Sequence, residues 1–373
     1  MRDAQAAGCI LLGMVLTMVL TMPLRASAAV SGIDGETPLF LGNKYYWQGL
    51  YEDAIELYLQ ADGSEWAAGI VGASRTWALQ GEYEQALDIC RESMRGPQQD
   101  PYIATQLAEV MAVVGQLDEA LALLQEVAEM PTPPLRSLVQ YGRLLDLKGR
   151  RDRAHEVFQI AVDRFAGNLD SDEIAMIALA NWQLERFHDA NRLFRDAIRL
   201  DPTNLEAQVL WGDLYLEKYN RVEALKAYQQ ALDQNRWYVA ALVGAAKASV
   251  GTGSYQYLSE ALGTNPISPD ALIVLADLAL ANGEFELASS YIDRVLETNP
   301  VSLPAQTLAA GMAALRDDQA TFDRLADDVA AQSPGNGRFY ADIADVYAKN
   351  YRFSEAVELA KKAVNTDPRY WQG

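Results

Sequence analysis

A helical pattern that repeats about every 34 residues constrains this chain more than any other feature. The segments GEYEQALDIC (81–90), GQLDEALALL (115–124) and GRRDRAHEVF (149–158) share one form. In each, a glycine and a polar turn precede an alanine, and a bulky apolar residue follows four positions later. The alanine recurs at Ala54, Ala86, Ala120, Ala154, Ala190, Ala224, Ala288 and Ala356. Repetition at this period indicates an array of small structural units instead of one compact core.

Each alanine is preceded, twelve positions earlier, by glycine, alanine or serine. Two further units carry Leu258 and Phe322 at the alanine position. Every unit contains two amphipathic stretches of helical period joined by a short turn. We expect the two small residues to face each other and to let the paired helices approach closely. The matches define ten units, which begin near residues 35, 67, 101, 135, 171, 205, 239, 269, 303 and 337.

These units resemble the tetratricopeptide repeat (TPR) over about residues 35–370. The resemblance implies an all-α fold, a right-handed α-solenoid of about ten helix–turn–helix units, after an N-terminal signal segment. The chain lacks the tryptophan that the family places near the start of the first helix. The unit at 239–268 is about four residues short, and we expect its second helix (YQYLSEAL) to be stunted. The expected divisions are 1–28 (signal peptide or uncleaved anchor), 29–34 (linker), 35–268 (units 1–7), 269–368 (units 8–10) and 369–373 (an incomplete next unit).

The first 28 residues have the pattern of an export signal. Residues 9–24 form an uncharged apolar run that is short for a membrane span, and Ala26 and Ala28 fit an A-x-A cleavage site. We expect cleavage after Ala28; the alternative is an uncleaved anchor. Cys90 would then be the remaining thiol, and an exported chain without a disulfide fits a bacterial periplasm or cell envelope.

The composition argues against several classes of function. A net charge of -20 opposes binding to nucleic acid or anionic lipid. The segment HEVFQ (155–159) lacks the second histidine of a zinc motif, and His188 falls in a different unit. We therefore predict a protein that is not an enzyme and holds no metal or cofactor.

The resemblance also implies a concave groove lined by the first helix of each unit. Groove positions supply aromatic, cationic and anionic residues, a mixture that suits an extended or helical peptide with polar anchors. The paired Lys and Asn of the family's carboxylate clamp are absent, since Asn43 has no lysine partner. The predicted partner-binding residues are Tyr46, Trp47, Arg75, Tyr102, Arg143, Trp182, Asp213, Lys247 and Asp277.

The leading hypothesis is a non-catalytic scaffold that binds protein or peptide partners in the bacterial envelope. Assembly of an envelope complex or a surface polymer is a specialisation suggested by family analogy alone. One alternative is the N-terminal array of a larger enzyme, a TPR-linked peptidase or glycosyltransferase, whose catalytic part lies beyond residue 373. Another is an inner-membrane assembly factor that touches the membrane only through its uncleaved N-terminal segment.

Overall fold

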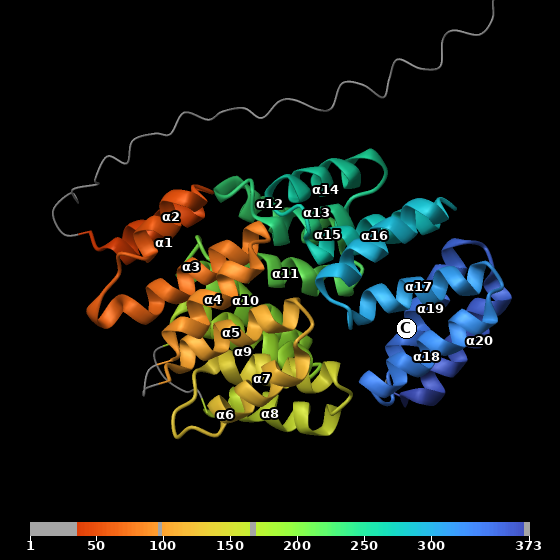
Figure 1. Cartoon of the computed structure of the whole chain (residues 1–373), viewed down its shortest axis with the longest axis horizontal. Coiled ribbons are helices and arrows are strands. Elements are labelled where there is room, and N and C mark those ends of the chain that lie inside the picture. Colours follow the sequence, from red (N-terminus) through yellow and green to blue (C-terminus); the bar gives the residue numbers. More distant parts are fainter. Residues whose placement is uncertain (1–35, 96–98, 165–168, 369–373) are drawn as a thin grey trace, which may run out of the picture. The chain divides into compact units, whose positions relative to one another are not determined.

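The computed structural model describes residues 36–95, 99–164 and 169–368, and within these ranges it contains α-helices, one short 3-10 helix and no strand (Figure 1). Each predicted unit is a helical hairpin, here called repeat 1 to repeat 10. The first helices are α1 (Pro38–Trp47), α3 (Trp66–Gln80), α5 (Pro101–Val113), α7 (Leu135–Leu147), α9 (Ser171–Gln183), α11 (Leu205–Glu217), α13 (Val239–Ala248), α15 (Pro269–Ala281), α17 (Leu303–Leu315) and α19 (Gly337–Lys349). The second helices are α2 (Tyr51–Tyr58), α4 (Tyr83–Ser93), α6 (Leu117–Ala128), α8 (Arg151–Arg164), α10 (Phe187–Leu200), α12 (Arg221–Gln234), α14 (Thr252–Thr264), α16 (Phe285–Thr298), α18 (Gln319–Gln332) and α20 (Phe353–Thr366). The predicted all-α solenoid is confirmed.

The predicted signal peptide, the linker 29–34 and the incomplete unit 369–373 lie outside the described residues. In the ranges that the structure does describe, no helix is both long enough and apolar enough to cross a membrane. The division of the array between residues 268 and 269 stays a prediction.

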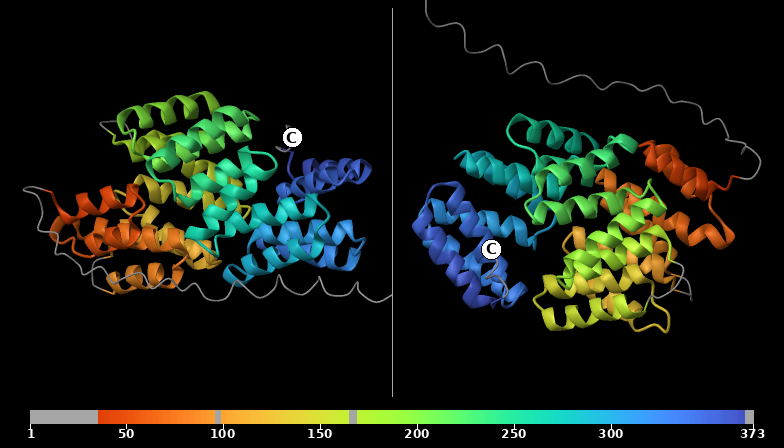
Figure 2. Two further views of the ribbon diagram at one scale, coloured as in Figure 1. Left: turned by 90° about the horizontal axis from the view of Figure 1, so that it is seen from above. Right: turned by 180° about the vertical axis from the view of Figure 1, so that it is seen from behind.

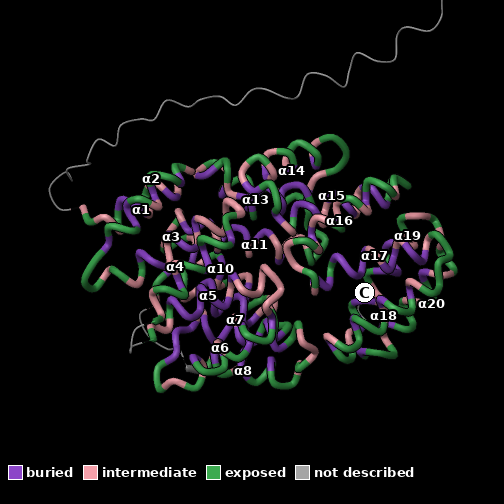
Figure 3. The backbone as a smooth tube through the Cα atoms, viewed as in Figure 1, coloured by how far each residue is buried: buried purple, intermediate pink, exposed green. Residues whose placement is uncertain are grey.

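First helices contact first helices of the neighbouring repeats, so they form one layer of the solenoid and the second helices form the other. Side chains at the N-cap positions of several of these helices accept hydrogen bonds from the first backbone amides. Asp100 accepts hydrogen bonds from the amides of Tyr102 and Ile103 at 2.9 and 3.2 Å, and Asp170 forms a reciprocal capping box with Glu173. Such caps satisfy amides that have no partner inside the helix. Figure 3 shows buried and exposed residues alternating along the helices, as expected for helices that each turn one face toward a neighbour.

Close packing within each hairpin depends on the small residue of the first helix. A Cβ added at Gly42 would lie 2.8 Å from the ring of Tyr58, and one at Gly212 would lie 2.6 Å from the ring of Tyr228. The small residue therefore packs against the bulky residue one turn beyond the repeated alanine, and not against the alanine alone as expected. Cys90 occupies that bulky position in repeat 2, where burial raises its thiol pKa to about 11.

Repeat 7 departs from the prediction. Its second helix, α14, has 13 residues and is not stunted. The shortened element is α13, with 10 residues, which ends where Ser249 adopts an extended conformation. Gly251 then supplies a positive φ of 63° at the start of α14. The missing residues thus come from the end of the first helix.

The array coils tightly enough for later repeats to touch earlier ones. The linker that follows α12 reaches the turn between α1 and α2, and the views in Figure 2 show these segments beside each other. The same contact recurs one repeat further on: the linker after α14 meets the turn after α3, and the linker after α16 meets the turn after α5. The bonded residues are 182 to 189 positions apart in sequence.

We call this series of contacts the clasp, and each linker together with its turn a rung. Rungs 1, 2 and 3 use Asn235, Asn265 and Asn299. Each asparagine donates from Nδ2 to a carbonyl at the end of a first helix: to Tyr46 at 3.0 Å, to Ala78 at 3.5 Å and to Val113 at 3.1 Å. Each also accepts, through Oδ1, the amide two residues later, at 3.0 to 3.2 Å. Each asparagine therefore adds a donor to a carbonyl at a helix end, and in rungs 1 and 2 that carbonyl also accepts the turn amide of Gly49 or Gly81.

A glycine in the turn makes each rung possible. Gly49, Gly81 and Gly115 have positive φ angles of 75°, 87° and 84°. A Cβ would lie 2.8 Å from Trp237 at Gly49, and 2.5 Å from the asparagine Oδ1 at each of the other two. A fourth rung places the carbonyl of Pro334 against Gly149, and Arg151 nearby pairs with Asp367. Each of the first four turns is thus covered by a linker that lies more than five repeats later in the chain.

Candidate functional site

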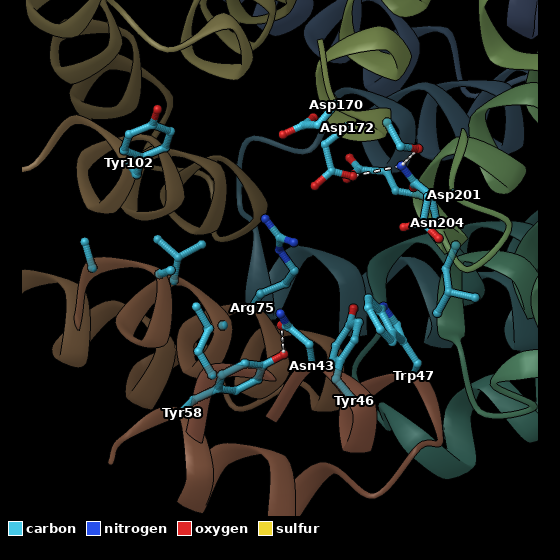
Figure 4. Close-up of a pocket in the computed structure, with 18 of the residues that line it drawn as sticks. Asn43, Tyr46, Trp47, Tyr58, Arg75, Tyr102, Asp170, Asp172, Asp201 and Asn204 are labelled. Carbon is cyan, nitrogen blue, oxygen red and sulfur yellow. Dashed lines mark hydrogen bonds between the residues drawn. The ribbon is translucent and has the colours of Figure 1, made fainter. Parts of the chain in front are cut away.

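A cavity of about 1020 Å³ lies on the inner side of the first repeats. One wall comes from α1, α3 and the start of α5. The other wall comes from the N-terminal ends of α9 and α11 and from the residue just before α13 (Figure 4). The first-helix layer therefore lines the cavity, and the coiling of the array brings its two walls together.

Aromatic side chains cover much of the first wall. Tyr46 is buried, and burial raises the pKa of its hydroxyl to about 12. Tyr58 donates a hydrogen bond to Asn43 Oδ1 at 2.8 Å, which holds both side chains at the base of the cavity. Trp47 lies beside Tyr46, and Tyr102 stands 60% exposed at the rim. These rings offer apolar contact surface at low cost in side-chain entropy.

Arg75 is the cation that lines the cavity. Its guanidinium points into the open space between the two walls (Figure 4). Across the described ranges it makes no hydrogen bond and no ion pair. Burial lowers the pKa of its guanidinium, but the negative charges of Glu206 and Glu109 act at longer range and contribute to raising it above the usual value. Within the described ranges this guanidinium therefore keeps N–H donors that no acceptor of the chain occupies.

Carboxylates and one amide line the opposite wall. Asp170 caps α9, and Asp201 accepts hydrogen bonds from the amide and the hydroxyl of Thr203 at 2.8 and 2.7 Å. Asp172 accepts a hydrogen bond from Asn204 Nδ2 at 2.8 Å. Each carboxylate is held in place by neighbouring donors, and the wall as a whole is negative.

A salt-bridge network joins this wall to the neighbouring first helices through Glu206, which also lines the cavity. Arg136 on α7 donates to Glu206 on α11, with one nitrogen–oxygen distance of 2.9 Å, and to Glu109 on α5 at 3.3 Å. Burial alone would raise the pKa of Glu206, but Arg136 and Arg75 together hold it below its usual value. Glu206 is therefore ionised at neutral pH, and the network ties the first helices of repeats 3, 4 and 6 together across the interior.

Four of the nine predicted partner-binding residues line the cavity: Tyr46, Trp47, Arg75 and Tyr102. The other five lie elsewhere. Trp182 donates to Glu217 at 2.8 Å, Asp213 accepts from Tyr228 at 2.6 Å, and Asp277 pairs with Lys349 at 2.8 Å, so each already has a partner within the chain. Arg143 and Lys247 are exposed outside the cavity. A role in partner binding stays a prediction for all nine.

The sequence analysis did not identify Asp170, Asp172, Asp201, Asn204 or Tyr238. These residues lie in linkers or at the start of helices, whereas the groove positions were counted inside the helices. The helix-start pattern Asp170–Glu173 was available as a signal for one of them. Their place beside the first repeats depends on the coiling of the array. The described residues contain no cluster of His, Cys, Asp and Glu that could hold a metal ion, and the absence of a metal or cofactor stays a prediction.

Comparison with known families supports the repeat assignment directly. Residues 175–238 and residues 253–312 each match a model described as tetratricopeptide repeat. The first segment spans α9 to α12, and the second spans most of α14 to α17.

Similar proteins are found among curated sequences and among solved structures. Anaphase-promoting complex subunit 7 of Arabidopsis thaliana is 22% identical over 318 residues, which cover 83% of this chain and 55% of that protein. The DnaJ homolog subfamily C member 7 homolog of Schizosaccharomyces pombe is 24% identical over 196 residues, 52% of this chain and 37% of that protein. This chain therefore spans about half or less of these relatives.

Among solved structures, yeast Tom70 matches with 13% identity and a TM-score of 0.41, over 89% of this chain and 76% of that one. The APC/C hetero-tetramer Cut9–Hcn1 matches with 11% identity and a TM-score of 0.44, over 89% and 87%. The repeat period, the ten helical hairpins and the two family matches agree, and the chain is a tetratricopeptide repeat protein.

Proposed function

We propose that this protein is a non-catalytic scaffold whose inner cavity holds an extended segment of a protein partner. The observation that carries the proposal is the cavity itself, which combines aromatic surface, an arginine without an ion pair and a wall of carboxylates. Such a mixture suits a polypeptide, whose apolar side chains, amides and charged groups vary along its length. The curated relative named as a subunit of the anaphase-promoting complex is in keeping with a role inside an assembly.

The charges of the cavity favour a partner segment that carries a basic residue and, close to it, a carbonyl or carboxylate oxygen that can accept a hydrogen bond. The wall at Asp170, Asp172 and Asp201 attracts a lysine or arginine, whereas Arg75 takes a carbonyl or carboxylate oxygen. The net charge of -20 adds a general attraction for basic proteins that weakens as salt is added.

The place where this scaffold works is also part of the proposal. The N-terminal pattern around Ala26 and Ala28 supports export to a bacterial periplasm or envelope, with a role in assembling an envelope complex or a surface polymer. N-terminal sequencing of the protein isolated from its own cells tests this part. A mature chain that still begins at Met1 would contradict cleavage.

Site-specific photo-crosslinking in living cells tests the binding role. A photoreactive residue replaces Val71, which lines the cavity, and in a matched control it replaces Tyr219, which is 88% exposed at the turn between α11 and α12. We expect position 71 to capture one partner through a short segment that mass spectrometry maps, and Arg75→Ala to reduce that adduct. Equal capture at both positions, or capture that Arg75→Ala leaves unchanged, would contradict binding in the cavity.

A further inference from the structure

The linker between α10 and α11 has the local structure of a clasp linker. Its first residue, Asp201, follows a second helix directly, as Asn235, Asn265 and Asn299 do in rungs 1 to 3. At all four positions φ lies between -128° and -137° and ψ between 90° and 99°. In all four, Oδ1 accepts the amide two residues later, and for Asp201 that distance is 2.8 Å. The backbone and this hydrogen bond therefore hold the four side chains in the same orientation.

This linker bonds no earlier turn among the residues that the structure describes. The clasp asparagines bond residues 182 to 189 positions earlier in the chain. Within the described ranges, the hydrogen bonds of residues 201–204 instead run to repeats 5 and 6. Asn204 bonds Asp172 at 2.8 Å, and Gln234 donates to the Pro202 carbonyl at 2.8 Å. The side chain of Asp201 lines the cavity, so it faces space that a ligand can occupy.

Aspartate in place of asparagine reverses the hydrogen-bonding character of this position. In rungs 1 to 3, Nδ2 donates to a carbonyl at the end of a first helix. In Asp201 the equivalent atom is Oδ2, and a carboxylate oxygen accepts hydrogen bonds but does not donate them. The described hydrogen bonds of the Asp201 side chain, from the amide and the hydroxyl of Thr203, both go to Oδ1. Oδ2 is therefore left to accept a donor from a ligand, and its negative charge favours a basic one.

Aromatic side chains stand opposite this carboxylate. Figure 4 shows the rings of Tyr46 and Trp47 projecting from α1 toward the wall that carries Asp201. Leu200, the neighbour of Asp201 in sequence, also lines the cavity and is 58% exposed. A lysine or arginine can place its charge between the carboxylate and the rings and lay its apolar stem against the leucine. A neutral donor such as a backbone amide would gain neither the ion pair nor the cation–π contact.

From this geometry we infer that Asp201 selects the partner, and that Asp201, Tyr46 and Trp47 form a subsite for one lysine or arginine side chain. The chain uses this linker structure three times to bind its own helix ends and once, with the donor exchanged for an acceptor, to bind a partner. The exchange also excludes helix-end carbonyls of the kind that the clasp binds, because two acceptors repel each other. This inference deepens the proposed function and rests on it: it names the partner residue that is recognised and the carboxylate that recognises it.

Selection from a library of random peptides displayed on phage tests the subsite. The full chain is the bait in three forms: the parent, Asp201→Asn and Asp53→Asn. Asp201→Asn removes the charge and exchanges the acceptor Oδ2 for a donor, and the clasp asparagines show that this backbone accepts asparagine. Asp53→Asn is the matched control, since it removes the same charge from an exposed position of α2 that does not line the cavity.

We expect the parent and Asp53→Asn to enrich peptides that share one lysine or arginine position, and Asp201→Asn to lose that preference. A synthetic peptide from the parent selection is then titrated against each protein, with its basic residue intact or replaced by methionine. The replacement should weaken binding to the parent and to Asp53→Asn by about ten-fold, and binding to Asp201→Asn by less than about two-fold.

A methionine penalty as large in Asp201→Asn as in the parent overturns the subsite and leaves the proposed function standing. A parent selection without a shared basic position does the same. A parent that enriches no peptide at all contradicts the proposed function, and the subsite with it. If Asp201→Asn does not fold, as judged by circular dichroism, Asp201→Ser replaces it with the same expectation, since Ser333 holds the equivalent position after α18.

Discussion

The turns of repeats 1 to 4 and those of repeats 5, 6, 9 and 10 share a left-handed backbone conformation but differ in residue type. The first group has glycine at this position, and a linker from later in the chain packs directly against that glycine. The second group has no such linker among the residues that the structure describes, and it holds larger residues at φ angles of 58° to 61°: Glu185, Tyr219, Asp317 and Tyr351. A positive φ alone therefore does not demand glycine here. The close approach of a second piece of chain does, because it leaves no room for a Cβ.

The largest expected effect comes from adding one methyl group to a turn under the clasp. Gly81→Ala should lower the free energy of unfolding by about 3 kcal/mol, combining left-handed strain with the loss of the Asn265 contacts. Gly283→Ala in repeat 8 is the matched control, since Gly283 also has a positive φ but nothing lies within 4 Å of its added Cβ. It should cost about 1 kcal/mol. Urea unfolding followed by circular dichroism compares the two, and equal losses would refute the distinction drawn between the two groups of turns.

The clasp can also be tested by changing an asparagine in a linker instead of a glycine in a turn. Asn299→Asp removes the donor to the Val113 carbonyl and places a carboxylate against it. We expect a loss of about 1–2 kcal/mol, because this part-buried hydrogen bond is broken and its acceptor is left unpaired. In the control Asn282→Asp, the exposed Nδ2 donor to the Tyr255 hydroxyl is lost, but that hydroxyl can donate to the new carboxylate instead, so stability should hardly change. Similar losses in both variants would mean that rung 3 contributes nothing.

The dependence of stability on alkaline pH tests the burial of Tyr83, whose hydroxyl accepts a hydrogen bond from Asn265 in rung 2. Burial raises the pKa of Tyr83 to about 12, against a weaker opposing effect of its hydrogen bond with Asn265. The unfolded chain loses this proton near pH 10, whereas the folded protein keeps it. The contribution of the Tyr83 hydroxyl to the free energy of unfolding is therefore complete below pH 10. Between pH 10 and about pH 12 it falls by about 1.4 kcal/mol per pH unit.

Tyr83→Phe should therefore flatten the fall in stability between pH 10 and 12, as measured by urea unfolding at each pH. Tyr219→Phe changes an exposed hydroxyl in an open turn and should follow the parent curve. A Tyr83→Phe curve that runs parallel to the parent would show that this hydroxyl is not buried at rung 2.

The smallest effect should have the opposite sign. Tyr219→Gly at an open turn relieves left-handed strain and loses little packing, because Tyr219 is almost fully exposed. We expect a gain of about 0.5–1 kcal/mol, measured as a rise in Tm. A fall in Tm of similar size would indicate that Tyr219 packs against the protein and that its turn is not open.

The sequence predicted the local structure of this protein because a repeat is stabilised by its immediate neighbours. The 34-residue period, the small residues such as Gly42 and Gly212, and the repeated alanines were sufficient to place ten helical hairpins and the family. Groove positions counted inside the helices also identified Tyr46, Trp47 and Arg75 at the cavity. The residues missing from repeat 7 were assigned to the wrong helix of the pair, because a shortened period does not show which of the two helices is shorter.

Only the tertiary structure decided how tightly the array coils. Small rotations between successive repeats add up over more than five repeats, and the sequence pattern of one repeat does not specify their sum. That sum brings Asn235 to Tyr46 and sets the acidic residues of α9 and α11 opposite Arg75. The glycines of the first four turns were visible in the sequence as turn residues. Their second role, to leave room for a linker from a distant repeat, became apparent only when the coil was seen closed.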